Sequence, residues 1–98
     1  MPSLRVVTAD LHVHTCLSPC ATLDMTPRKI VAQARRMKLD MIAITDHNTA
    51  ENAGALMDAA ADVALTVIPG LEITTAEEAH VLALFPTLAA ALAMQELV

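Results

Sequence analysis

Apolar and polar residues follow one another along the chain in blocks that predict alternating strands and helices. Residues 5–11 (RVVTADL) favour β-structure and lead directly to the first histidine. The short apolar runs MIAIT (41–45) and ALTVI (64–68) have the length of buried strands, and each stops at polar or turn-forming residues. The run HVLALF (80–85) suits a fourth strand. We therefore expect four strands.

Three segments between and after these runs have the apolar periodicity of helices. Thr26 and Pro27 form an N-cap and first-turn pair that opens a helix to about Lys38. The apolar stripe of this helix consists of Ile30, Ala34 and Met37. A second helix is expected over residues 50–61, with apolar positions at Ala53, Leu56, Met57, Ala60 and Ala61. A closing helix over residues 87–98 is apolar almost all round, which predicts burial on several sides.

The alternation of strands and helices predicts the α/β fold class. Strand–helix–strand units of this spacing pack in a right-handed sense and build a parallel sheet, and ligands gather at the carboxyl ends of its strands. With 98 residues and no internal repeat or linker, the chain is expected to form a single domain over residues 1–98.

Composition and charge narrow the classes of function. Hydrophobic residues make up 55% of the chain and Phe85 is the one aromatic residue, so the core has to be aliphatic. The net charge is −5 and most of the six basic residues lie in residues 28–38, which argues against stable binding to duplex nucleic acid. The sequence has neither the pattern of a membrane span nor that of a signal peptide. We expect a soluble cytoplasmic protein without membrane contact.

The histidines that follow the first predicted strand have the spacing of a metal chelate. His12 and His14 are two residues apart, so on an extended backbone both imidazoles project from one face and can bind one ion. The alternative is a pair of histidines that only form hydrogen bonds in a loop. Asp10 is expected to support them, either by accepting a ring N–H or by binding N–H groups of the following loop.

A second polar motif follows the second predicted strand. Asp46, His47 and Asn48 are by themselves typical of a turn in which the aspartate and the asparagine bind the backbone. The carboxyl ends of neighbouring parallel strands, however, lie about 5 Å apart. If the first two strands are such neighbours, His47 enters the same pocket as His12 and His14.

Glu72 and His80 are the candidates in the second half of the chain. Glu72 lies two residues after Pro69 and Gly70 in an apolar setting, where an ionised carboxylate is costly unless it is paired or binds metal. A bridging metal ligand would explain it, and an exposed glutamate at a strand end is the alternative. His80 stands at the boundary of a loop and a strand, where a hydrogen-bonded histidine without metal is the alternative to a ligand.

The two cysteines lie in the loop that is expected over residues 15–25. Cys20 is either a buried thiol or a thiolate ligand, and a thiolate would favour zinc or iron over magnesium. Cys16 is expected to pack. A disulfide between them would have to close a tight loop and is disfavoured in the cytosol.

Taken together and in this order, DLHVHT, ITDHN, PGLE and the histidine of AHVLALF resemble the PHP (polymerase and histidinol phosphatase) family of metal-dependent phosphoesterases. The resemblance implies a distorted (β/α)7 barrel whose mouth binds up to three divalent ions, with zinc, manganese and iron as the candidates. His12 and His14 would bind the first ion, and Glu72 would bridge the first and the second. His80 would join the second ion, and His47 would bind the third.

The chain departs from the family pattern in two respects. Cys20 stands where related proteins can present a histidine, which leaves the identity of the metal open. A PHP domain is also usually much longer and adds a further histidine and a late Asp-x-His pair, whereas no His, Cys or Asp follows His80 here. We therefore expect parallel βα units that form about half of a PHP-type barrel, completed by a C-terminal half or by a second copy in a homo-oligomer.

The function implied by the resemblance is hydrolysis of a phosphorylated small molecule or nucleotide, as a phosphomonoester or phosphodiester, by metal-activated water. Asp46 and His47 are the predicted catalytic residues, with Asp46 as one candidate for handling protons. Arg28 and Lys29, at a helix N-terminus, are candidates for binding phosphate, although a solvated basic face explains them as well. The alternative function is a metal-binding or structural half-domain without turnover that needs a second copy or a partner chain.

Overall fold

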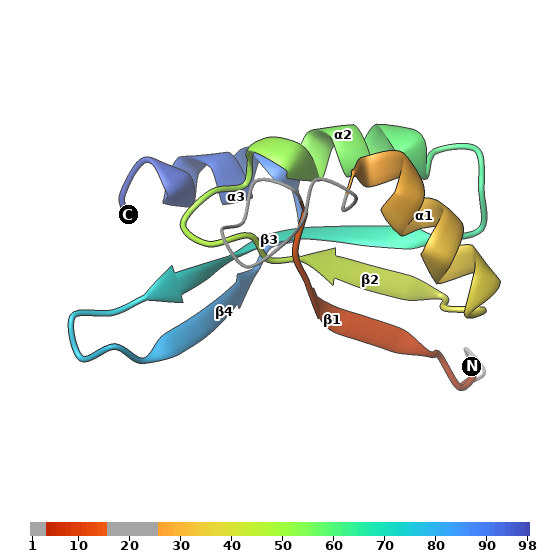
Figure 1. Cartoon of the computed structure of the whole chain (residues 1–98), viewed down its shortest axis with the longest axis horizontal. Coiled ribbons are helices and arrows are strands. Elements are labelled where there is room, and N and C mark those ends of the chain that lie inside the picture. The colour runs from red at the N-terminus through yellow and green to blue at the C-terminus, as the bar shows by residue number, and fades with distance from the viewer. Residues whose placement is uncertain (1–3, 16–25) are drawn as a thin grey trace.

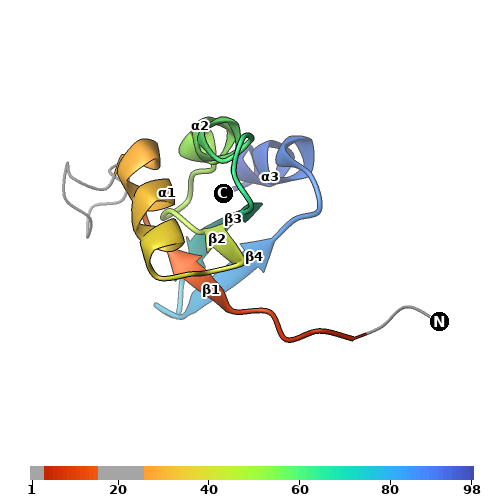
Figure 2. The same cartoon turned by 90° about the vertical axis from the view of Figure 1, so that its right-hand side faces the viewer.

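The protein is a single curled sheet with three helices on one of its faces (Figure 1, Figure 2). The computed structural model describes residues 4–15 and 26–98. In chain order the elements are β1 (Ala9–Val13), α1 (Pro27–Arg36), β2 (Met41–Ile44), α2 (Glu51–Ala59), β3 (Thr66–Thr74), β4 (His80–Leu84) and α3 (Leu88–Gln95).

The strands lie side by side in the order β1-β2-β3-β4. β1, β2 and β3 are parallel, with Ala9 opposite Met41 and Met41 opposite Thr66. β4 is antiparallel to β3, with Gly70 opposite Leu84. The α/β fold class is therefore confirmed, but the expectation of a wholly parallel sheet is wrong for the last strand.

β3 is longer than predicted because it pairs with two strands in succession. Its first half pairs with β2 as far as Pro69, and its second half, from Gly70 onward, pairs with β4. Proline and glycine were expected to stop the strand, yet a proline is tolerated where ladder pairing changes partner. The carbonyl of Pro69 accepts the N–H of Phe85 at 2.9 Å, which ties the end of β4 to this point. Glu72 consequently lies inside a strand.

β1 begins at Ala9, four residues later than the sequence indicates. The neighbouring strand β2 begins only at Met41, opposite Ala9. Residues 4–7 therefore have no described strand to pair with, and they are exposed. His12 therefore lies within β1, and His14 lies one residue past its end.

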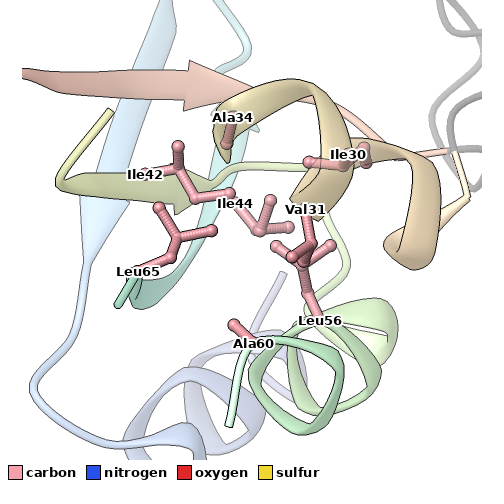
Figure 3. Close-up of a cluster of buried hydrophobic side chains, with 8 residues drawn as sticks. All are labelled: Ile30, Val31, Ala34, Ile42, Ile44, Leu56, Ala60 and Leu65. Atoms are coloured by element: carbon pink, nitrogen blue, oxygen red, sulfur yellow. The ribbon is translucent and has the colours of Figure 1, made fainter. Parts of the chain in front are cut away.

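The hydrophobic core fills the space between the sheet and the helices. One cluster lies between β2 and the helices α1 and α2 (Figure 3), and it consists of Ile30, Val31, Ala34, Ile42, Ile44, Leu56, Ala60 and Leu65. A second cluster beneath α3 consists of Ala50, Leu71 and Ala91. Each isoleucine, valine or leucine side chain that is fully buried here stabilises the fold by about 1.5–3 kcal/mol relative to exposure.

Three packing expectations are wrong. Met37 is 62% exposed because α1 ends at Arg36 and Lys38 adopts a left-handed backbone with φ 58°, which turns the chain away from the helix path. Ala61 is exposed because α2 ends at Ala59. Only Ala91 of α3 is buried, since among the described residues one side of this helix alone meets the sheet.

The face of the sheet opposite the helices carries no covering element among residues 4–15 and 26–98 (Figure 2). Both outer strands are largely exposed, and Leu11, Leu82 and Leu84 retain 43%, 39% and 41% of their accessible surface. No helix in this part of the chain has the length and apolarity that crossing a bilayer requires. The single-domain organisation over residues 1–98 stays a prediction.

Candidate metal centre

The candidate centre is built around Glu72, in the second half of β3. Leu71 packs toward α3, so the alternation of a strand turns Glu72 to the helix-free face. The backbone of Glu72 holds the turn after β2: its N–H donates to the carbonyl of Asp46 at 2.8 Å, and its carbonyl accepts the N–H of Asn48 at 2.8 Å. Glu72 is only 3% exposed, which excludes the alternative of a solvated glutamate at a strand end.

Four histidines from three segments surround the carboxylate of Glu72. Nε2 of His12 forms a close contact with Oε1, and Nε2 of His14 lies 3.7 Å from the same oxygen. Nδ1 of His47 lies 2.9 Å from Oε2, and Nδ1 of His80 lies 3.0 Å from it. The rings of His14 and His47 stack with their centroids 4.8 Å apart. All four histidines thus meet at one rim of the sheet.

These side chains form two groups that share Glu72. The first triad is His12, His14 and Glu72, and the second triad is His47, Glu72 and His80; in each, one ligand atom per residue lies within 4.8 Å of the others. Imidazole nitrogens combined with a carboxylate oxygen are a donor set that suits zinc, iron and manganese. The geometry therefore fits divalent cations bound on either side of one carboxylate.

The electrostatics of the centre favour the protonation states that metal binding needs. Burial raises the pKa of Glu72, but hydrogen bonds with His12 and His80 and the charges of His47 and His12 outweigh it, so this pKa lies below its ordinary value. Burial lowers the pKa of His14, and repulsion from His47 and His12 acts in the same direction against the attraction of Glu72. An ionised carboxylate and a neutral imidazole are the forms that bind a cation.

A second polar network, which the sequence did not reveal, holds two of the ligand-bearing turns together. The carboxylate of Asp46 is fully buried and accepts hydrogen bonds from the backbone N–H of Thr15 at 2.6 Å and from its hydroxyl. Oγ1 of Thr15 also accepts from Nδ2 of Asn52 at 3.2 Å, in the first turn of α2. Because Thr15 follows His14 and Asp46 precedes His47, this network fixes the stacked pair of rings.

Replacing Asp46 should destabilise the fold, because it leaves the buried N–H and hydroxyl of Thr15 without their acceptor. We expect Asp46→Ala to lower the free energy of unfolding by about 3 kcal/mol, measured by urea denaturation of the metal-free protein. The matched control is Asp58→Ala, on the exposed surface of α2, where a change within about 0.5 kcal/mol is expected. Equal effects of the two substitutions would show that the network contributes nothing.

The remaining predicted residues lie around this centre or outside the described chain. Asp10 accepts the backbone N–H of His12 at 3.1 Å, so it supports the motif through the backbone. Arg28 and Lys29 are exposed on the first turn of α1, where Arg28 lines a groove with two acidic residues of the α2 region, Asp58 and Asp62. Cys20, the predicted ligand, and Cys16 lie outside the described residues. Metal binding and catalysis by all these side chains stay predictions.

A curled α/β sheet that gathers histidines and a buried carboxylate at one rim is an α/β half-barrel with a candidate metal site. The family model described as PHP domain matches residues 10–96. The chain belongs to the PHP domain family, as the sequence motifs indicated.

Similar proteins support this assignment and are all much longer than the chain. The 5'-3' exoribonuclease Rnm of Salmonella typhimurium is 38% identical over 73 residues, which cover 72% of this chain and 24% of the relative. Rnm of Escherichia coli is 37% identical over 73 residues, which again cover 72% of this chain and 24% of the relative. The chain thus spans about a quarter of the length of these curated relatives.

Two solved structures share the fold of this part. A protein of Bifidobacterium adolescentis assigned to the metal-dependent phosphoesterases has a TM-score of 0.64 and 32% identity, covering 80% of this chain and 27% of its own. An amidohydrolase of Chromobacterium violaceum, with bound sulfate and no metal, has a TM-score of 0.67 and 26% identity, covering 85% of this chain and 31% of its own. These matches confirm the expectation of a partial PHP-type barrel.

Proposed function

We propose that the rim of this sheet binds divalent cations and that the protein is a metal-dependent phosphoesterase acting on a phosphomonoester or a nucleotide phosphodiester. The observation that carries the proposal is the position of Glu72. One buried carboxylate contacts four histidines, and each of its two oxygens serves a different triad. A carboxylate shared in this way is the arrangement expected for a ligand between two ions.

The first triad would hold one ion and the second triad another. The resemblance to the family implies a third ion at His47, but Nδ1 of His47 lies 2.9 Å from the Glu72 oxygen that His80 also contacts. In this arrangement His47 can serve the second ion. When bound, divalent ions of such sites lower the pKa of water and neutralise the charge of a phosphate.

The two predicted catalytic residues, Asp46 and His47, differ in burial, and this difference indicates different roles. Asp46 is completely buried, and its carboxylate accepts hydrogen bonds from the backbone N–H and the hydroxyl of Thr15. This arrangement favours a positioning role over direct proton transfer. The side chain of His47 is 21% exposed at the same rim, so it is the member of the pair that a substrate can reach. We therefore place the contact with substrate on His47 and the positioning of His47 on Asp46.

Phosphoesters are the favoured substrate class because the relatives point to them. Two curated relatives are named exoribonucleases, one solved structure is assigned to the phosphoesterases, and another holds sulfate, a tetrahedral anion like phosphate. Arg28 and Lys29, on the first turn of α1, stay candidates for binding the phosphate group of such a substrate.

The test measures hydrolysis with manganese or zinc on two kinds of substrate. We expect phosphate release from nucleoside monophosphates or mononucleotide release from a short oligoribonucleotide, and loss of that activity in His12→Ala. Glu77→Gln, an exposed change in the turn between β3 and β4, should retain it. A folded protein that is loaded with metal and inert on both substrates would exclude the enzymatic function for this chain.

A specific observation also favours the second candidate function, a metal-binding half-domain that packs against a second copy or a partner chain. The helix-free face and its outer strands expose Leu11, Leu82 and Leu84, and a sheet edge of this kind is a pairing surface. Bound metal without hydrolysis, together with a molar mass above that of the monomer in light scattering, would favour this candidate. A monomer that persists on dilution would count against it.

A further inference from the structure

Thr45 lies on the same face of the sheet as the metal-binding side chains. Ile42 and Ile44 pack toward α1 and α2 (Figure 3), so the alternation of β2 directs the next residue, Thr45, to the opposite face. Leu71 packs toward the helices as well, which places its neighbour Glu72 on that opposite face too. Thr45 and Glu72 therefore project from the helix-free face of adjacent strands.

The backbone pairing places Thr45 beside the two residues whose imidazoles stack. The N–H of Thr45 donates to the carbonyl of Val13 at 2.8 Å, which in a parallel pair makes His14 its neighbour across the ladder. His47 follows two residues later in the chain, and its ring stacks on that of His14. Thr45 is thus a backbone neighbour of one histidine from each triad, His14 across the ladder and His47 along the chain.

The hydroxyl of Thr45 is buried without a partner. Thr45 has no accessible surface, and among residues 4–15 and 26–98 its Oγ1 is the one buried side-chain nitrogen or oxygen that forms no hydrogen bond. Leaving a buried hydroxyl unpaired is unfavourable, and valine has the same shape without that penalty and favours strands equally well. The equally buried hydroxyl of Thr15, in contrast, bonds to Asp46 and Asn52.

We propose that Thr45 is a ligand-positioning residue of this centre, whose hydroxyl bonds to an oxygen atom that enters with the bound cation. The inference rests on the proposed function only in so far as the centre binds a divalent cation. The oxygen belongs either to water around the cation or to a phosphate group, because both offer the same hydrogen-bonding chemistry.

The chemistry of the surrounding groups supports this role. Oε1 of Glu72 is engaged by His12, and Oε2 is engaged by His47 and His80. A hydroxyl both donates and accepts a hydrogen bond, whereas a neutral imidazole that binds metal keeps only its other N–H as a donor. Thr45 therefore adds a neutral group that orients an oxygen ligand without taking a coordination position.

The test compares Thr45→Val, which keeps the shape and removes the hydroxyl, with Thr45→Ser, which keeps the hydroxyl. Calorimetry measures the binding of Mn²⁺ alone and then of inorganic phosphate to the Mn²⁺-loaded protein. We expect Thr45→Val to weaken one of these steps about tenfold and Thr45→Ser to bind as the original protein does. A weaker Mn²⁺ step assigns the oxygen to water, and a weaker phosphate step alone assigns it to phosphate.

Urea denaturation of the metal-free proteins provides the readout that separates this role from a structural one. We expect Thr45→Val to be as stable as the original protein or more stable, because it removes an unpaired polar group. Lower stability with unchanged binding would identify a purely structural hydroxyl, bonded to a buried water, and would overturn the inference. Unchanged binding and stability would overturn it as well. If the original protein binds no Mn²⁺, the proposed function itself fails, which is a distinct result.

Discussion

Glu72→Gln is expected to abolish metal binding at both triads at once. The substitution keeps the shape of the side chain, but it removes the negative charge and replaces one carboxylate oxygen with an amide NH2 group, which does not bind cations. Loss of an outer-shell partner already lowers metal affinity by about 10-fold to 100-fold, so loss of the shared ligand should exceed 100-fold. Calorimetry with Mn²⁺ and elemental analysis of the purified protein measure the effect.

Two further variants test whether Glu72→Gln loses metal at both triads because Glu72 is a ligand in each of them. His80→Ala removes a ligand of the second triad only, so we expect it to abolish one of the two binding steps and leave the other. Glu78→Gln makes the same chemical change at an exposed position and should bind metal normally. If Glu72→Gln removed no more metal than His80→Ala, Glu72 would not serve both triads.

Gly70→Ala is expected to destabilise the protein by about 2–3 kcal/mol or more. A Cβ at position 70 would lie 2.5 Å from the backbone oxygen of Ala83 and 3.2 Å from that of Ile44. Since both are backbone atoms, the added methyl group would push β3 and β4 apart where β3 changes its pairing partner. β4 also carries His80, so metal affinity should fall with stability, as denaturation and calorimetry would show.

Gly54→Ala is the matched control, because it adds the same methyl group at the chain's other glycine. Position 54 lies inside α2, and its added Cβ would meet only the flexible end of Leu88 at 3.0 Å. Alanine also favours a helix over glycine by about 1 kcal/mol, so Gly54→Ala should be neutral or stabilising. A loss of stability at Gly54 equal to that at Gly70 would contradict the role given to the close approach of β3 and β4.

The fold class and much of the geometry of the centre were predictable from local patterns. Apolar runs that stop at His or Asp mark parallel strands, and the carboxyl ends of such strands share an edge. This argument predicted that His47 would lie beside His12 and His14, and the structure brings the three together with Glu72. Their binding of metal stays a prediction.

Other features depend on pairing that a single sequence does not reveal. The residues Pro69 and Gly70 looked like the end of a strand, but β3 runs through them by changing its partner from β2 to β4. An antiparallel strand begins at the rim where its parallel neighbours end, which is why His80 reaches the centre from the start of β4. The bonds of Thr15 to Asp46 and Asn52 were not predictable either, because common polar residues have no distinctive spacing.

The contacts between Glu72 and the histidines also have a consequence for the protein without bound metal. Small zinc modules unfold after chelation, because nothing else holds their ligands together. Here the imidazoles of His12, His47 and His80 contact the carboxylate of Glu72 directly, and β3 and β4 are joined by their own ladder. If the centre binds metal, we therefore expect the backbone to stay folded when a chelator removes the ions, so that the chain can be reloaded with a chosen cation.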